Sequence, residues 1–207
     1  MVASTREDVD FIVSLAGPGI NSTDLMMLQT SKMSKAEGTS DHIVEINSKI
    51  LKEVFTYLKN NPDTENTIVS DGLKEIVYKG YDKFPTSLHK EIGTKEELFK
   101  QQSPMFLSDW FRYFIAFEPD QYWSKVSCPV LAINGELDLQ VTPKENLAGI
   151  EKALKKAGNQ QVTLKEFKQL NHLFQISQTG AGSEYAILEE TFNEEVMAFV
   201  VSWLNKN

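Results

Sequence analysis

The sequence has one cysteine, Cys128, and three histidines in 207 residues. A single cysteine excludes a disulfide within the chain, and so few histidines leave too few ligands for a Cys/His zinc site. Basic residues are also in the minority, since 21 Lys and Arg stand against 29 Asp and Glu, for a net charge of −8. Nucleic acids and anionic membranes are bound through a surplus of basic side chains, so we expect no nucleic-acid and no membrane partner.

Long hydrophobic runs are absent as well. No stretch approaches the roughly 18 apolar residues of a membrane span, and residues 1–8 lack the basic start and apolar centre of a signal peptide. We therefore expect no membrane segment and take the cytoplasm as the default location. The acidic residues are scattered without the spacing of a metal site, so we expect neither a metal ion nor another cofactor.

Short apolar runs bounded by turn residues are present, and they are typical of strands buried on both faces of a parallel sheet. We expect three such strands, at residues 9–16, 130–133 and 162–167. Two helices alternate with them, one from Pro143 to just before Gly158 and a last one over residues 189–204. This order indicates an α/β fold with a short, mainly parallel sheet and flanking helices.

Residues 21–110 have a different pattern. After Asp41 apolar residues recur at three- and four-residue steps, and shorter helical patterns follow. We interpret this segment as a helical insertion between two strands. The predicted domains are therefore a sheet domain formed by 1–20 and 111–207, and a helical domain formed by 21–110.

Two titratable side chains, one acidic and one basic, follow two of the expected strands. Asp138 comes after strand 130–133, and His172 follows strand 162–167, 34 residues later. The carboxyl ends of parallel strands meet at one edge of a sheet, where functional groups collect. A carboxylate at this position can accept the proton of one imidazole nitrogen and leave the other to act as a base. His42 and His89 lie in polar parts of the insertion, and we interpret them as ordinary surface residues.

The sequence around these residues resembles a known family. Residues 131–141 (LAINGELDLQV) with 170–174 (LNHLF) are similar to the carboxyl-terminal half of α/β-hydrolase-fold serine esterases and their prolyl-oligopeptidase-like relatives. Residues 9–19 (VDFIVSLAGPG) resemble the sixth strand of that fold, and a helical cap after this strand matches 21–110. The resemblance implies that Asp138 is the acid and His172 the base of a catalytic triad that cleaves a carboxylic ester or related acyl bond.

The nucleophile of such a triad has no counterpart here. In the family it sits on a G-x-S-x-G turn just before the sixth strand, whereas only about eight residues precede that strand in this sequence. Only Gly38 is followed two residues later by a serine, Ser40, and the fifth position of that match is His42 instead of glycine. We therefore expect the carboxyl-terminal portion of a serine hydrolase, with an incomplete triad and no activity alone.

Other functions stay open at this point. The chain could be one part of a split hydrolase, or a non-catalytic protein that binds a ligand or a partner. Aromatic residues of the insertion and its border, Trp110, Phe111 and Phe114, are candidates for binding the small-molecule acyl substrate, although packing within the insertion would also explain them. Strand 9–16 would lack the neighbour that the family places beside it, so we expect self-association through this edge, as a homodimer or larger assembly.

Overall fold

Two compact units make up the computed structural model, which describes residues 1–206. The sheet unit comprises Met1–Glu37 and Glu118–Asn207, and the helical unit comprises Gly38–Phe117. The prediction of a cap domain over 21–110 stays a prediction, and the helix that follows residue 21 belongs to the sheet unit. Each unit is described separately below.

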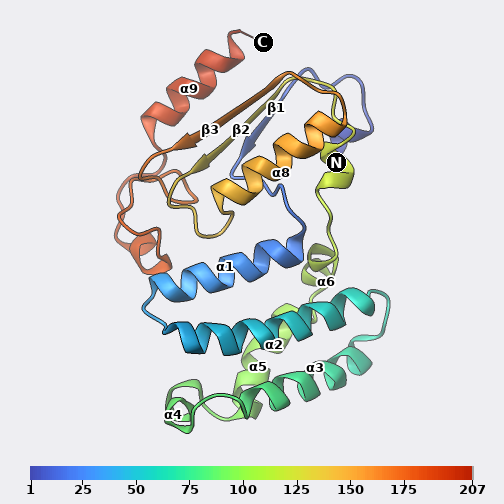
Figure 1. Cartoon of the computed structure of the whole chain (residues 1–207), viewed down its shortest axis with the longest axis vertical. Helices are drawn as coiled ribbons and strands as arrows, with labels where there is room; N and C mark the ends of the chain where they lie inside the picture. The colour runs from blue at the N-terminus through green and yellow to red at the C-terminus, as the bar shows by residue number, and fades with distance from the viewer. Residues whose placement is uncertain (207) are drawn as a thin grey trace. The chain divides into compact units, whose positions relative to one another are not determined.

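Three parallel strands form the sheet of the sheet unit, in the order β1-β2-β3 (Figure 1). Their bounds are β1 Ile12–Leu15, β2 Val130–Gly135 and β3 Val162–Phe167. In the register, Val13 lies opposite Leu131, and Leu131 lies opposite Thr163. The protein is therefore an α/β protein with an open parallel sheet, as the sequence predicted. The first strand is shorter than expected, because its ladder with β2 begins only at Ile12, opposite Val130, and residues 9–11 do not join it.

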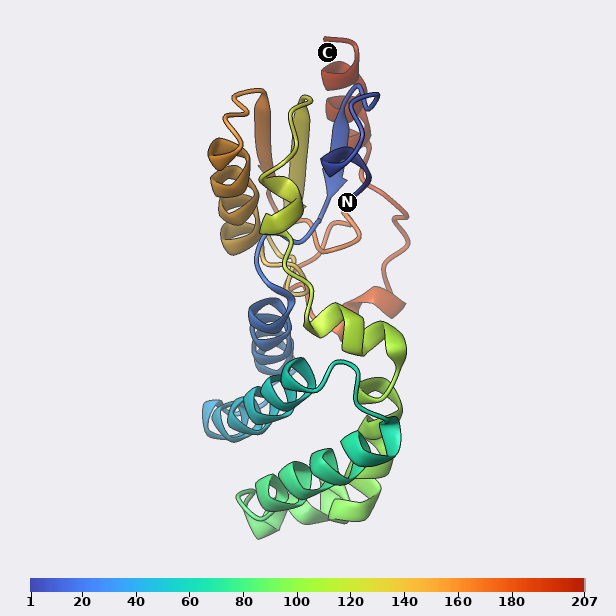
Figure 2. The ribbon, with the colours of Figure 1, turned by 90° about the vertical axis from the view of Figure 1, so that its right-hand side faces the viewer.

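All six residues of β2 are buried, which is why its residues 130–133 form a continuous apolar run in the sequence. On one face of the sheet, Val130 and Ala132 pack against α8 (Pro143–Lys156). On the other face, Leu131 and Ile133 pack against α9 (Glu194–Leu204). Figure 2 shows these two helices on opposite sides of the strands. Alternate side chains of one central strand thus build both halves of the core.

Helix α9 begins later than the sequence predicted, at Glu194 and not at 189. The side chain of Asn193 accepts a hydrogen bond from the backbone N–H of Glu195 and caps the helix. The side chain of Glu190, upstream of this cap, instead accepts from the backbone N–H of Ile176. The remaining elements of the sheet unit are η1 Val2–Ser4, α1 Ser22–Ala36, α7 Asp120–Trp123 and η3 Gly182–Ala186.

The helical unit is built around aromatic and branched side chains. Phe55, Phe106 and Phe111 are each 1% exposed, and their ring centroids lie 5.8–6.5 Å apart. Arg112 donates to Asn66 Oδ1 and to three backbone carbonyls of the loop 61–64, and so ties this loop to the last helix of the unit. The elements of the unit are α2 Asp41–Asn60, α3 Asn66–Tyr81, η2 Thr86–Leu88, α4 His89–Ile92, α5 Lys95–Phe106 and α6 Asp109–Ile115.

Candidate functional site

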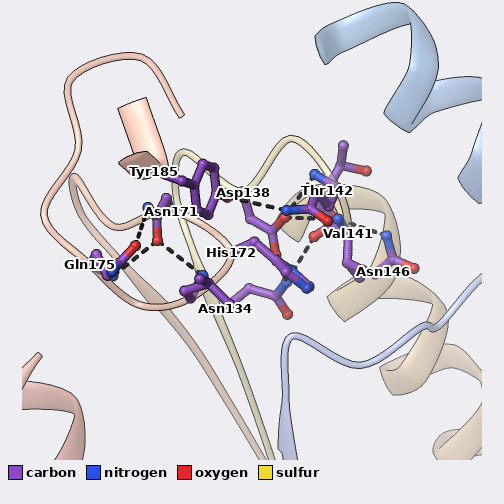
Figure 3. Close-up of polar contacts among 11 residues, drawn as sticks. Asn134, Asp138, Val141, Thr142, Asn146, Asn171, His172, Gln175 and Tyr185 are labelled. Carbon is purple, nitrogen blue, oxygen red and sulfur yellow. Dashed lines mark hydrogen bonds and ion pairs between the residues drawn. The ribbon is translucent and has the colours of Figure 1, made fainter. Parts of the chain in front are cut away.

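Asp138 and His172 lie in direct contact at the carboxyl-terminal edge of the sheet. Oδ2 of Asp138 is 2.9 Å from Nδ1 of His172 (Figure 3). An ionised carboxylate can only accept hydrogen bonds, so Nδ1 of the imidazole is the donor when it faces such a carboxylate. The Asp138 side chain is fully buried, whereas the His172 side chain is 26% exposed. The structure therefore brings together the two residues that the sequence predicted as acid and base.

Three further hydrogen bonds hold the buried carboxylate. Its Oδ1 accepts from the backbone N–H groups of Gln140, at 2.9 Å, and Val141, at 2.8 Å. Its Oδ2 accepts from Nδ2 of Asn134, at 3.2 Å. Together with the contact to His172, these bonds supply hydrogen-bond partners to both oxygens of a side chain that is fully buried.

The turn after β2 is tied to the loop that carries His172. Backbone N–H groups of Glu136 and Leu137 donate to the carbonyls of Phe167 and Leu170, at 2.8 and 2.9 Å. Gly135 makes this approach possible, because a Cβ atom there would lie only 2.2 Å from the carbonyl oxygen of Leu170. Backbone hydrogen bonds therefore join the end of β2 directly to the loop that carries His172.

Asn171 shapes the loop around His172. Its side chain is completely buried, and its Oδ1 accepts from the backbone N–H groups of Leu173 and Gln175, at 2.9 and 3.0 Å. Its Nδ2 donates to Oε1 of Gln175 at 3.0 Å. Phe174 takes the left-handed conformation, with φ of 57°, and its ring is buried against Phe192. A polar side chain next to His172 thus determines the path of the tight loop that presents it.

The predicted substrate-binding residues all lie on α6 of the helical unit. Phe111 is 1% exposed and belongs to the aromatic core of that unit. Trp110 is 67% exposed, and its ring stacks on Phe114 with the centroids 5.0 Å apart. A pocket of about 540 Å³ in the same unit is lined mainly by α2, with Ile76 of α3, and includes none of these three residues. Their role in substrate binding stays a prediction.

Asn134, Asn171 and Tyr185 are residues of the site that the sequence did not single out. Asn134 follows the predicted apolar run directly, and a buried amide at a strand end next to an acid is a signal that could have found it. Asn171 directly precedes His172. An asparagine in a loop often shapes a tight turn by bonding to the backbone two residues further on, and this is the signal that could have found it. Tyr185 lies 45 residues from Gln140, its hydrogen-bond partner, and no sequence pattern marks it.

Within residues 1–206, no group of three or more His, Cys, Asp or Glu side chains is arranged to hold a metal ion. None of the helices in this part of the chain combines the length and the apolar character that crossing a membrane requires.

No family model matches the sequence, and no curated protein matches it either. Among solved structures, the crystal structure of esterase E22 aligns with 88% of this chain and 55% of its own, at 15% identity and a TM-score of 0.38. A mutant of the same esterase aligns at 12% identity and a TM-score of 0.34, covering 88% of this chain and 54% of its own. The chain thus spans about half the length of these esterase chains.

Fold and site together define the class of this chain. It is an α/β protein whose open parallel sheet carries a hydrogen-bonded carboxylate–imidazole pair at the carboxyl ends of two neighbouring strands.

Proposed function

We propose that Asp138 and His172 are the acid and the base of a serine hydrolase that cleaves a carboxylic ester or a related acyl bond. The attacking serine lies outside the residues of this sequence, on another segment of a longer protein or on a second chain. In this proposal the sheet unit is the carboxyl-terminal part of an α/β-hydrolase core, and the helical segment predicted over 21–110 is its cap.

The observation that carries the proposal is the 2.9 Å contact between Asp138 Oδ2 and His172 Nδ1. The carboxylate fixes the tautomer with the proton on Nδ1, so Nε2 is free to take a proton from a hydroxyl. When Nε2 takes that proton, the buried negative charge stabilises the imidazolium that forms. The order along the chain, acid before histidine, is that of serine hydrolases with this type of fold.

The position of the pair also supports the proposal. Both residues follow neighbouring parallel strands, β2 and β3, and the crevice outside the carboxyl ends of such strands is where α/β proteins bind their ligands. The exposed fraction of His172 leaves the imidazole reachable by a substrate, whereas Asp138 is shielded from water. A base must be reachable and its orienting acid needs no access, so this difference in exposure matches the two roles.

The proposal has one consequence for the isolated 207-residue chain. Without a serine beside Nε2, a short p-nitrophenyl ester should be hydrolysed no faster by the chain than by its His172→Ala variant. Turnover that His172→Ala abolishes would mean that the nucleophile is within this sequence, and would overturn the proposed origin of the serine.

The positive test uses the protein as the cell makes it, purified through a carboxyl-terminal tag together with any chain bound to it. Ester hydrolysis by that preparation should fall by roughly 10⁴- to 10⁶-fold on His172→Ala. His42→Ala, which removes a histidine of the helical unit, is the matched control and should leave the rate unchanged. Hydrolysis that persists after His172→Ala would reject the assignment of the base.

One observation favours a second function, ligand binding without catalysis by the helical unit. Trp110 is 67% exposed although it is among the largest apolar side chains, and it is stacked on Phe114. Exposed stacked aromatic rings are a common surface for apolar or planar ligands. Titration with a soluble short-chain fatty acid should quench tryptophan fluorescence in the wild type and not in Trp110→Phe if this surface binds acyl groups.

A further inference from the structure

One edge of β1 offers backbone hydrogen-bonding groups to a further strand. The backbone N–H groups of Ile12 and Ala16 donate to the carbonyls of Pro129 and Ile133, at 2.9 and 2.8 Å. The backbone groups of successive residues in a strand face opposite sides, so those of Val13 face away from β2. Within the part of the chain that the structure describes, β1 pairs with β2 alone. This edge is therefore open to strand addition.

Apolar side chains flank the open edge on the face of the sheet that α9 covers. Phe11 is 42% exposed, and its ring contacts that of Trp203 in α9, with the centroids 6.0 Å apart. Val13 packs against the same core cluster as Trp203. Side chains alternate along a strand, so Leu15, which is 48% exposed, lies on this face too. Half-exposed apolar side chains thus follow the open edge at both ends of β1.

The flank of α9 next to this edge is apolar as well. Three exposed residues of α9 each directly follow a residue that packs against the sheet, and they are Met197, Val201 and Leu204. Successive residues of a right-handed helix are turned by about 100°. Because α9 runs antiparallel to the strands on this face, that turn points the three side chains toward β1 (Figures 1 and 2). We call these three residues, together with Phe11 and Leu15, the apolar seam.

Helix and strand can be brought to a common level through the contact of Phe11 with Trp203. Val13 lies two residues further along the chain, which is about 6.6 Å in a strand. An antiparallel helix covers that distance in about four residues. Met197 and Val201 therefore lie on either side of the level of Val13, beside the middle of the open edge.

We propose that the apolar seam is the interface with a second copy of this chain. The two β1 strands pair antiparallel about a two-fold axis at Val13, so that Val13 faces its own counterpart and Phe11 of each copy faces Leu15 of the other. The residues that face the open edge then exchange backbone hydrogen bonds with the copy. Both α9 helices lie on the same face of the joint sheet, where Met197 and Val201 of one copy cover those of the other.

The seam suits a copy because it is complementary to itself under this two-fold rotation. Phe11 and Leu15 are equally far from Val13 along the chain, so the rotation brings one exposed apolar side chain onto the other. The α9 helices run antiparallel across the axis, which places Glu194 and the other acid of the helix start toward the end of the second helix. Lys206 is the charged residue at that end. Opposite charges and opposite ends of the helix dipoles therefore meet.

This pairing leaves the Asp138–His172 site of each copy open. The carboxyl ends of the two β1 strands point in opposite directions, so the two sites lie at opposite ends of the joint sheet. A copy bound in this way brings no residue to the site of the other. The association therefore does not supply a serine, and it does not depend on the function proposed above.

Disulfide cross-linking of the full chain in a Cys128→Ser background tests the register. Opposite residues of an antiparallel pair that exchange hydrogen bonds have Cα atoms about 5.5 Å apart, which a disulfide can span. Oxidation of an equal mixture of Phe11→Cys and Leu15→Cys chains should therefore give covalent dimers. Either variant alone should give few, since its two cysteines would lie about 13 Å apart along the strands. Equal yields from the mixture and from one variant alone would overturn the proposal.

Sedimentation equilibrium tests the part of the interface that α9 contributes. Val201 is 57% exposed, so Val201→Glu should fold normally. It places a charge in the middle of the seam and should raise the dissociation constant of the dimer at least about tenfold. Ser202→Glu is the matched control, with the same charge one residue later on the flank away from β1, and should change the constant by no more than about twofold.

Two results of this measurement would overturn the proposal. A wild type that stays monomeric up to its highest soluble concentration would show that no copy covers the seam. Equal dissociation constants for the wild type and Val201→Glu would show that a dimer forms elsewhere.

Discussion

Nδ2 of Asn134 lies 3.2 Å from Oδ2 of Asp138, the same oxygen that contacts Nδ1 of His172. Asn134 is completely buried and also donates to the carbonyl of Val141, at 2.8 Å. One amide therefore holds both the acid and the end of its turn. The position of the carboxylate depends on the last residues of β2 as much as on the histidine it faces.

Asn134→Ala should destabilise the sheet unit, because the variant leaves a buried carboxylate and a buried carbonyl each short of one donor. The expected loss in the free energy of unfolding is about 1–3 kcal/mol, measured by urea denaturation. Asn60→Ala, at the exposed end of α2, is the control and should stay within about 0.5 kcal/mol of the wild type. Equal stability of the two variants would contradict the role given to Asn134.

Asn171→Ala should loosen the loop that presents His172. The backbone N–H groups of Leu173 and Gln175 lose their common acceptor, Oδ1 of Asn171. Both amides should exchange with deuterium at least about fivefold faster, as the loss of about 1 kcal/mol of protection requires. The amides of Gln140 and Val141, which are bonded to Asp138, are internal controls. Uniform acceleration of all four would point to global unfolding instead.

Glu184 should make stability depend on pH in acid. Its pKa in the folded protein is about 2, below the ordinary value of 4.5, because Ser177, Thr179 and two backbone N–H groups donate to it. A lowered pKa contributes stability that is fully present above the ordinary value and is lost as the pH falls through the window from about 4.5 to about 2. The stability difference between the wild type and Glu184→Gln should therefore be largest above pH 5 and narrow through that window.

Glu189→Gln is the control for this experiment, since Glu189 is exposed and accepts none of the hydrogen bonds that hold Glu184. Thermal unfolding of the three proteins from about pH 2 to pH 7 provides the comparison. A Glu184→Gln difference that stays constant over this range would show that the carboxylate charge does not contribute.

Arg112→Lys should destabilise the helical unit. The guanidinium donates at 2.7–2.8 Å to Asn66 Oδ1 and to the carbonyls of Asn61, Pro62 and Thr64. The ammonium group of lysine is more compact and cannot reach all of these acceptors from one position. The free energy of unfolding, measured with denaturant, should fall by about 2 kcal/mol. Arg6→Lys, at an exposed pair with Asp8, is the control and should leave the unfolding midpoint close to that of the wild type.

We propose that the free edge of β1 leads the chain to associate with itself. Within the described residues β1 pairs only with β2, and Leu15 on this strand is 48% exposed. Open strand edges with apolar side chains recruit other strands. Light scattering at high protein concentration should give a mass above that of a monomer, and Leu15→Lys should lower it. Ile187→Lys, at a 77% exposed position outside the strands, should not lower it. A monomeric wild type would refute the proposal.

Much of the sheet unit could be predicted from the sequence, for a local reason. A strand buried on both faces is mostly apolar, as β2 is from Val130 to Ile133. Thr142–Pro143 and Gly158 bound α8 by their backbone preferences. The start of α9 could not be predicted in the same way. Its apolar spacing extends toward residue 189, and a contact with Ile176, elsewhere in the chain, decides that Glu190 lies outside the helix.

By itself the sequence determined which residues end the strands, and therefore that Asp138 and His172 are candidates for one edge of a parallel sheet. Only the tertiary structure decided that Oδ2 of Asp138 and Nδ1 of His172 come within 2.9 Å of each other, that Asn134 bonds to the acid and Asn171 shapes the loop of the histidine, and that Tyr185 contacts Gln140 in the turn of the acid. The physical reason is the separation of the interacting residues along the chain. Strand ends follow from the properties of neighbouring residues. Contacts between residues 34 or 45 positions apart depend instead on the register of β2 against β3 and on the packing of the loops after these strands.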